Sequence, residues 1–181
     1  MRDADRSLTR QAASRIPSQM GSVLSAVEEG AEGAKLWLGA ATVMGTLGGG
    51  RGRRAAAEGL GAVVLAQVVF AGLCKRLVGR RRPPKEWIRH DEVEDRPESP
   101  SFPSGHAAAA VGFTAAVAPS WPLAGALCAV PAALVAVERV QSGAHYPSDV
   151  AAGAAIGLIS AWLTRHASHL LLRHRLQRPG C

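Results

Sequence analysis

The sequence predicts an all-α, transmembrane helical bundle of about five to six helices. Its apolar residues gather in five blocks, which are separated by polar breaks that mostly carry arginine. A soluble helical bundle is the alternative, but its helices would carry charged residues along their outer faces. Blocks two to five are instead apolar on every side, as membrane helices are. The net charge of +7 indicates an anionic partner, either phosphate esters or anionic lipid.

Residues 1–33 form a polar N-terminal segment ahead of the first block. A weak helical pattern runs through Ile16, Met20, Val23, Leu24 and Val27. The pattern is compatible with a helix on the membrane surface, and a partly ordered tail explains the segment equally well. We expect the membrane domain to cover residues 34–172, and residues 173–181 to form a basic C-terminal tail.

The first two apolar blocks are residues 34–49 and 55–74. The first is short for a membrane span, because crossing about 30 Å of hydrocarbon takes about 20 residues. Lys35 at its start could lengthen it by snorkelling. The second block is long enough to cross, and we expect the arginines of residues 51–54 to form a tight basic loop between the two.

The other three blocks are residues 105–118, 121–137 and 150–163, the last of which can continue to residue 172. Pro131 predicts a kink in the fourth block, of a kind that membrane helices tolerate. Gly153 and Gly157 give the fifth block a face of small residues. Such a face permits close contact with a neighbouring helix.

Three polar clusters lie at the edges of these blocks, and the first covers residues 75–83. We expect the second helix to continue through this cluster until Pro83 and Pro84 stop it. Lys75 and Arg82 are seven residues apart, close to two helical turns, so both could face one side and clamp a phosphate. Taken alone, the cluster is better explained as flanking charge at a membrane edge. We assign that role to Arg76, Arg80 and Arg81.

The second cluster is Pro-Ser-Gly-His, residues 103–106. Ser104 is well placed as the N-cap of the third helix. The amides of Gly105 and His106 would then be free donors at a positive helix end, which binds phosphate readily. Gly105 also removes a side chain where an oxyanion must approach closely. A plain helix start explains these four residues about as well.

The third cluster contains Arg139, His145 and Asp149. Pro147 is a good first residue for the fifth helix. Asp149 could then accept a hydrogen bond from one nitrogen of His145, which would fix the tautomer and leave the other nitrogen free to attack. This pairing favours His145 over His106 as a nucleophile, but the residues alone do not decide between them.

The order of the clusters is more specific than any one of them. Lys-x6-Arg-Pro, Pro-Ser-Gly-His and Arg-x5-His-x3-Asp follow one another, each at an apolar boundary. This order resembles the type 2 phosphatidic acid phosphatase (PAP2) superfamily. That family includes bacterial undecaprenyl-pyrophosphate and phosphatidylglycerophosphate phosphatases and glucose-6-phosphatase, and vanadium-dependent haloperoxidases share its pocket. The motifs cover residues 75–149, and the fifth block matches the helix that follows them.

The resemblance implies a role for each matching residue. His145 would be the nucleophile and form a phosphohistidine, and Asp149 would orient it. His106 would protonate the leaving oxygen and later activate water. No metal or cofactor is implied, because cationic side chains take the charge-neutralising role that magnesium has elsewhere. The phosphate would be held by Lys75, Arg82, Ser104, Gly105 and Arg139.

Two features depart from the family pattern. The family often has serine before the arginine of the third motif, where this chain has Glu138. The change removes no implied catalytic group but alters the local charge. Members also commonly have six spanning helices, whereas this sequence has five apolar blocks. Either a surface helix before residue 34 replaces the first span, or that span is missing.

Together the motifs predict a metal-independent integral membrane phosphatase that forms a phosphohistidine. Its substrate would be a lipid or isoprenoid phosphate, as a monoester or a diphosphate, and its partners would be the bilayer and a phospholipid or polyprenyl phosphate, not nucleic acid. Arginines flank both sides of the bundle and leave the orientation open. The resemblance favours a multi-pass protein of the cell membrane with an external active site. The alternatives are a vanadate-dependent haloperoxidase-like oxidase and a non-catalytic membrane protein that binds phosphate or anionic lipid.

Overall fold

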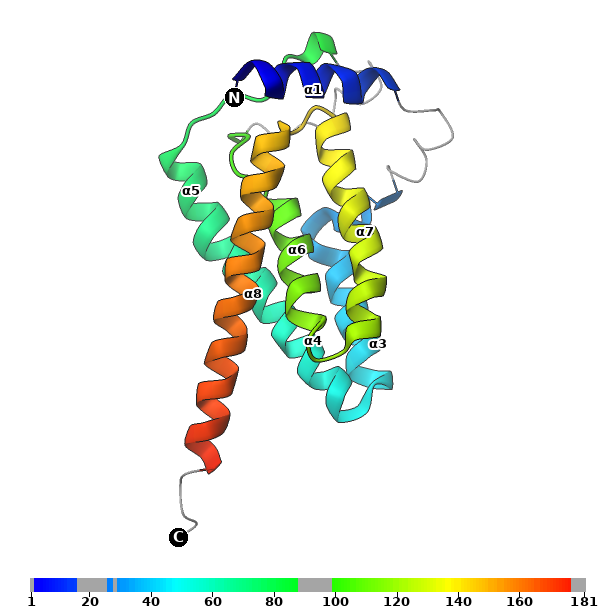
Figure 1. Ribbon diagram of the computed structural model, residues 1–181, viewed down its shortest axis with the longest axis vertical. Helices are drawn as coiled ribbons and strands as arrows, with labels where there is room; N and C mark the ends of the chain where they lie inside the picture. The colour runs from blue at the N-terminus through cyan, green and yellow to red at the C-terminus, as the bar shows by residue number, and fades with distance from the viewer. Residues whose placement is uncertain (1, 16–25, 28, 88–98, 177–181) are drawn as a thin grey trace.

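The computed structural model describes residues 2–15, 26–27, 29–87 and 99–176, and these contain helices but no strand (Figure 1). The all-α prediction is therefore confirmed. The helices are α1 (Arg2–Arg15), α3 (Lys35–Leu47), α4 (Gly49–Val64), the π-helical η2 (Leu65–Ala71), α5 (Gly72–Leu77), α6 (Gly105–Val117), α7 (Pro122–Gln141) and α8 (Pro147–Leu176), with the short 3-10 turns η1 (Glu32–Ala34) and η3 (Lys85–Trp87).

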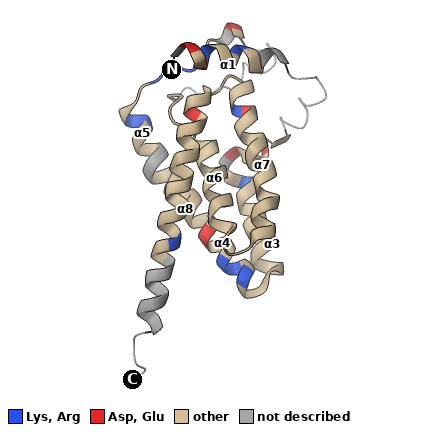
Figure 2. Ribbon diagram, in the orientation of Figure 1, with Lys and Arg blue, Asp and Glu red and all other residues tan. Residues whose placement is uncertain are grey.

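The five apolar blocks correspond to α3, the continuous run from α4 to α5, α6, α7 and α8. The run Gly49–Leu77 and the helix Pro122–Gln141 are each long and apolar enough to cross a membrane, and Gly105–Val117 is apolar but shorter. Charged residues gather toward the two ends of the bundle (Figure 2). Large apolar side chains point outward between those ends, as lipid-facing residues do, and they include Val64, Val68, Leu123, Leu127, Val130 and Leu158.

The packed core is built from small residues and a few large rings. The indole of Trp37 on α3 packs against the ring of Phe113 on α6, with 5.3 Å between the ring centroids. Both side chains are buried, and the alanines of α6 at positions 107–110 are buried beside them. Because alanine keeps neighbouring helices close, α6 can occupy the centre of the bundle between α4, α7 and α8 (Figure 1).

The contact between α6 and α8 confirms the predicted role of the two glycines. A Cβ atom on Gly153 would come within 2.3 Å of the Ser104 carbonyl oxygen, and one on Gly157 would come within 2.6 Å of the Ala108 carbonyl oxygen. Real side chains do not tolerate such distances. Glycine at both positions therefore lets the backbone of α8 lie directly against α6.

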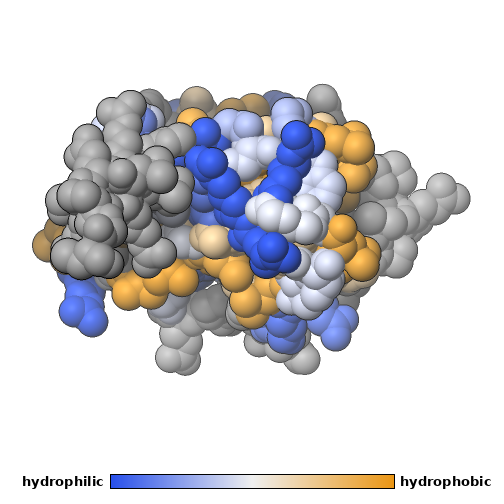
Figure 3. All heavy atoms as spheres, turned by 90° about the horizontal axis from the view of Figure 1, so that it is seen from below, coloured by the Kyte–Doolittle hydropathy of each residue, from blue (hydrophilic) through white to orange (hydrophobic). Residues whose placement is uncertain are grey.

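The predicted basic loop at residues 51–54 was wrong, because these arginines belong to the first turns of α4. The chain reverses at Gly48 and Gly49 alone. Gly49 has a φ of 58°, and a Cβ atom on Gly48 would come within 2.4 Å of the Trp121 ring. Two glycines thus complete the turn without a longer loop. Hydrophilic residues gather at this lower end of the molecule, with hydrophobic residues around them (Figure 3).

The second helix also ends earlier than predicted, at Leu77 and not at Pro83. Residues 78–84 have no helical structure. Placing Gly79 in a helix would cost conformational entropy of the backbone. The residue before a proline, here Arg82, also avoids the helical region of backbone angles. The arginines of this segment also find partners outside a helix, as described below. Lys75 and Arg82 therefore do not share a helical face.

The helix of the N-terminal segment is α1, which lies across the upper end of the bundle (Figure 1). It contacts α7 and α8. Of the expected surface helix, Ile16, Met20, Val23 and Leu24 lie outside the described residues, and Val27 packs against the core. The described helix is mostly polar and is held by protein contacts rather than by an apolar face.

Candidate active site

The three motifs meet at the upper end of the bundle, beneath α1. The amide of Ser104 donates to the carbonyl of Asp149 at 3.0 Å, which joins the start of α6 to the start of α8. The amide of His145 donates to the carbonyl of Arg139 at 2.9 Å. Gly143 has a φ of 60° in the turn between them. These backbone bonds bring the second and third motifs together.

Ser104 caps α6 as the sequence predicts. Its backbone is extended, and its side chain accepts a hydrogen bond from the amide of Ala107 at 3.3 Å. Ser104 is fully buried and Gly105 is buried beside it. A Cβ atom on Gly105 would come within 2.9 Å of Oε1 of Gln67. Glycine here therefore keeps the helix start close to the η2 segment.

Lys75 and Arg82 approach each other across Ser99. The ammonium of Lys75 donates to the Ser99 hydroxyl at 3.4 Å, and Nη2 of Arg82 donates to the same oxygen at 3.3 Å. Arg82 Nε donates to the carbonyl of Ser99 at 3.0 Å, and its Nη1 donates to the carbonyl of Ala144 at 2.6 Å. The structure thus brings the two cations together although the predicted shared helix face is absent.

Arg139 supplies the third cation from the last turn of α7. Its side chain is buried and forms an ion pair with the neighbouring Glu138, which is buried as well. The residue that departs from the family pattern therefore contacts the arginine beside it. Glu138 thus places a carboxylate against one of the three cations.

His145 is buried, and its Nδ1 lies 2.6 Å from the carbonyl oxygen of Ser101. A carbonyl only accepts, so Nδ1 carries the hydrogen and the lone pair is on Nε2. Burial, together with the charge of Arg82, lowers the pKa of His145 to about 3, although the bond to Ser101 acts to raise it. The ring is therefore a neutral imidazole near pH 7.

The predicted hydrogen bond between His145 and Asp149 is replaced by this bond to Ser101. The Oδ2 atom of Asp149 lies 4.0 Å from Nδ1 of His145, which is an electrostatic contact and too long for a hydrogen bond. The same oxygen accepts from the amide of Tyr146 at 3.0 Å. Asp149 is fully buried, so its charge acts on the imidazole at short range.

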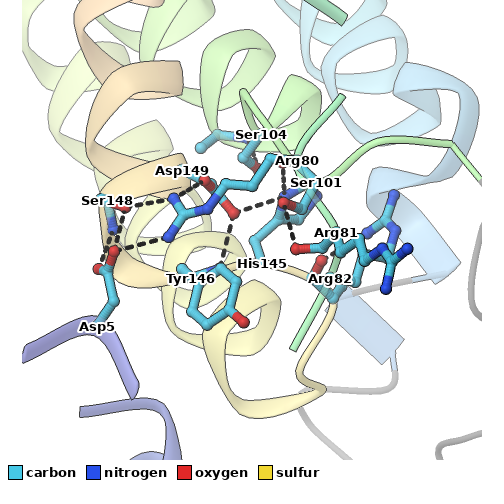
Figure 4. A network of polar contacts seen from close by, with 12 residues as sticks. Asp5, Arg80, Arg81, Arg82, Ser101, Ser104, His145, Tyr146, Ser148 and Asp149 are labelled. Atoms are coloured by element: carbon cyan, nitrogen blue, oxygen red, sulfur yellow. Dashed lines mark hydrogen bonds and ion pairs between the residues drawn. The ribbon is translucent and has the colours of Figure 1, made fainter. Parts of the chain in front are cut away.

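The other oxygen of Asp149 accepts from Arg80, with 2.5 Å between Nη1 and Oδ1 (Figure 4). The guanidinium of Arg80 also stacks on the ring of Tyr146, with 4.2 Å to the ring centroid. Arg80 was predicted to be a flanking charge, and that prediction was wrong. It is instead a partner of the carboxylate beside His145.

His106 lies on the first turn of α6, within electrostatic range of the same three cations as His145: Lys75, Arg82 and Arg139. The two imidazoles and the three positive side chains therefore form one cluster, the cationic pocket proposed below for the phosphate. Such a pocket suits a tetrahedral oxyanion, because fixed cations neutralise its charge and a neutral imidazole can attack or transfer a proton. All eight predicted site residues lie at this end of the bundle.

Comparison with known proteins agrees with this arrangement. The PAP2 superfamily model matches residues 57–173, which is more than half of the chain and includes all three motifs. The chain belongs to the PAP2 superfamily. Two solved structures share this PAP2 fold, each with a TM-score of 0.69. One is the first transmembrane PAP2 type phosphatidylglycerolphosphate phosphatase from Bacillus subtilis, 20% identical, with 93% of this chain and 86% of that chain covered. The other is Aquifex aeolicus LpxE, 22% identical, with 88% and 93% covered.

Curated PAP2 relatives are more similar in sequence but longer. The chain is 39% identical over 110 residues to a lipid A 1-phosphatase of Rhizobium etli, covering 54% of this chain and 46% of that protein. It is 37% identical over 97 residues to a decaprenylphosphoryl-5-phosphoribose phosphatase of Mycobacterium tuberculosis, covering 54% and 52%. The chain thus spans about half the length of the curated relatives it matches.

Four neighbours of the PAP2 motifs were not identified from the sequence: Arg80, Ser99, Ser101 and Gln67. The serines contact the site through backbone carbonyls and a hydroxyl, which leave no recognisable residue pattern. Gln67 is a polar residue within the second apolar block, and it belongs to a π-helical segment, a feature often found at functional sites. Residues 88–98, which hold five of the six acidic residues between Pro84 and Phe102, lie outside the described residues.

Proposed function

We propose that the protein is an integral membrane phosphatase that hydrolyses a lipid or isoprenoid phosphate through a phosphohistidine on His145. The observation that supports the proposal is the cluster of two imidazoles and three cations near the start of α6 and α8. Membership of the PAP2 superfamily supports a hydrolase, and the relatives named above are lipid A and polyprenyl-linked phosphatases.

In the first step, the Nε2 lone pair of His145 attacks phosphorus while the bond from phosphorus to the lipid oxygen breaks. The hydrogen stays on Nδ1 and remains hydrogen-bonded to the Ser101 carbonyl oxygen, and the positive charge that develops on the ring lies beside the Asp149 carboxylate. His106, in its protonated form, gives a proton to the leaving oxygen and becomes neutral. The phosphoryl group then resides on His145 as a phosphohistidine.

In the second step, His106 takes a proton from water, and the water oxygen attacks phosphorus. The nitrogen–phosphorus bond breaks, His145 becomes neutral again, and inorganic phosphate leaves. Lys75, Arg82 and Arg139 neutralise the phosphoryl oxygens in both steps, and the amide groups at the capped start of α6 add hydrogen-bond donors. This chemistry uses only groups of the protein and water, so we propose that it needs no metal.

The apolar surface of the bundle supports an amphipathic substrate. The cationic pocket lies at the upper end of a bundle whose sides expose Leu123, Leu127 and Val130 of α7. A lipid tail could therefore remain in the bilayer while its phosphate enters the pocket. We propose a multi-pass arrangement with the pocket on the external face, and either a monoester or a diphosphate as the reacting group.

The proposal can be tested with the purified protein in detergent. We expect phosphate release from a panel of lipid and polyprenyl phosphates to persist in EDTA. His145→Ala and His106→Ala should each lower kcat by at least about 1,000-fold, in the range found for other nucleophile–base pairs. The control is His166→Ala, because His166 is exposed on α8 and should leave activity unchanged. Full activity in both site variants would refute the assignment.

Labelling quenched in alkaline detergent separates the two histidines, because a phosphohistidine is stable in base and is hydrolysed in acid. With a phosphate ester whose leaving group needs no proton, His106→Ala should accumulate phosphorus label on the protein, and His145→Ala should show none. The alternatives have distinct outcomes. A haloperoxidase-like enzyme would oxidise halide when vanadate is supplied, and a non-catalytic binder would retain phosphate or anionic lipid without turnover in every variant.

A further inference from the structure

Asp5 of α1 is a buried carboxylate that reaches the start of α8. Only 6% of its surface is exposed. Its Oδ1 accepts from the amide of Ser148 at 3.1 Å, and its Oδ2 accepts from the Ser148 hydroxyl at 2.7 Å. The same Oδ2 accepts from Nη2 of Arg80 at 2.9 Å. Donors from two other segments therefore hold this carboxylate (Figure 4).

Arg80 connects this carboxylate to the one beside His145. One arm of its guanidinium, Nη2, donates to Asp5, and the other, Nη1, donates to Asp149. The hydroxyl of Ser148 lies 2.7 Å from Nη1. A planar guanidinium bound on both sides has its orientation fixed. Its side chain is 26% exposed, so without the outer partner it could turn toward solvent.

We propose that Asp5 is a positioning residue for the phosphatase reaction, and that it acts through Arg80 on the Asp149 carboxylate. This inference rests on the proposed function, because it requires His145 to be the nucleophile. Arg80 holds Oδ1 of Asp149, which leaves Oδ2 facing the imidazole. If Asp5 is removed, Arg80 is held only on its inner side, and the carboxylate is less well placed to stabilise the charge that develops on His145.

The charges of Asp5 and Arg80 support the same inference. Burial raises the pKa of Asp5, but the bonds from Ser148 and Arg80 outweigh it and hold that pKa below its usual value. Burial lowers the pKa of Arg80, but its two carboxylate partners outweigh that effect and raise it. Both groups are therefore ionised near pH 7, and the contact between them is an ion pair with additional hydrogen bonds.

A cavity beside this ion pair offers a direct test. It has a volume of about 810 Å³ and is lined by Asp5, Arg80, Tyr146 and the backbone around Gly79, among others. A small carboxylate such as formate or acetate could occupy the space that Asp5→Ala creates. Replacing the lost carboxylate from solution should restore the outer partner of Arg80 without changing the protein.

We expect Asp5→Ala to lower kcat about 10-fold, as loss of residues behind a reacting group typically does, with KM within about two-fold of wild type. Sodium formate should restore part of the lost kcat, while sodium chloride at the same ionic strength should not. The matched control is Asp3→Ala, which removes an exposed carboxylate from the same turn of α1 and should keep wild-type kcat.

A double-mutant cycle tests whether Asp5 acts through Arg80. In an Arg80→Gln background, Asp5→Ala should lower kcat by less than two-fold, because its partner is already absent. Wild-type kcat in Asp5→Ala would overturn the inference. A loss of activity that accompanies early melting and that formate does not restore would overturn it too, because the defect would then be the docking of α1 alone.

The two proposals fail in different ways. If the wild-type protein releases no phosphate, the proposed function fails. If the wild type is active and depends on His145 but Asp5→Ala behaves as wild type, only the positioning role of Asp5 fails.

Discussion

Burial of His145 as a neutral ring couples the stability of the fold to pH. The ordinary pKa of histidine is near 6.5, whereas the folded protein lowers that of His145 to about 3. Between these values the unfolded chain binds a proton that the folded chain does not. The contribution of His145 to stability is therefore complete above pH 6.5 and is lost as the pH falls toward 3.

We expect this loss to appear in melting temperatures measured in detergent between pH 7 and 4. One bound proton changes stability by about 1.4 kcal/mol per pH unit within the window. The neutral variant His145→Gln should therefore show a shallower fall than wild type, and His166→Gln should fall as wild type does. Identical slopes for wild type and His145→Gln would show that the ring is not kept neutral.

Glu138 is the residue where this chain departs from the family motif, and the structure gives it a partner. Its carboxylate pairs with Arg139 inside the cationic pocket and so offsets part of the charge that would attract phosphate. We expect Glu138→Ser and the isosteric Glu138→Gln to strengthen inhibition by inorganic phosphate or vanadate. The inhibition constant should fall about ten-fold, which corresponds to about 1.4 kcal/mol.

The matched control for this charge change is Glu86→Gln, because Glu86 is an exposed acid on the 3-10 turn Lys85–Trp87. Its inhibition constant should equal that of wild type. Unchanged or weaker inhibition in both Glu138 variants would indicate that the carboxylate supports Arg139 rather than competing with the anion.

At the scale of the elements, the close packing of α6 against α8 also positions the residues of the candidate site. Ser104 begins α6 and lies against Gly153, whereas Gly157 packs one turn further along α8. We expect Gly157→Leu to separate the helices and to lower the free energy of unfolding by about 1–3 kcal/mol or more, as overpacking does. Activity should fall with it, because the start of each helix carries part of the pocket.

The control is Ala155→Leu, which adds a similar volume on an exposed position of the same helix. We expect its melting temperature and activity to match wild type. If Gly157→Leu also matches wild type in both, the close approach of the two backbones is not required.

Most element types and several boundaries could be predicted from the sequence because they depend on local chemistry. Ser104 as an N-cap, Pro147 as a first helical residue and the glycine face of α8 all act within a few residues. The end of the second helix could not be predicted. It depends on Arg80 and Arg82, whose side chains bind carboxylates and carbonyls elsewhere in the fold.

At the scale of the whole molecule, only part of the candidate site could likewise be predicted from the sequence. Motif spacing predicted residues that lie together at the upper end of the bundle, since each motif begins or ends a helix. Partners that are distant in sequence could not be identified. Asp5 and Arg80 are separated by 75 positions, and only the crossing of α1 over the bundle brings them into contact. No residue pattern near either one indicates the other.

The arginines at the start of α4 give the lower end of the molecule a positive charge of its own, opposite the cationic pocket at the upper end. With both ends basic, charge provides little preference for one direction of insertion when the purified protein enters preformed liposomes. A water-soluble substrate added outside such vesicles should reach about half of the molecules. Solubilising the vesicles should then roughly double phosphate release, and an unchanged rate would reveal a uniform direction of insertion set by something other than charge.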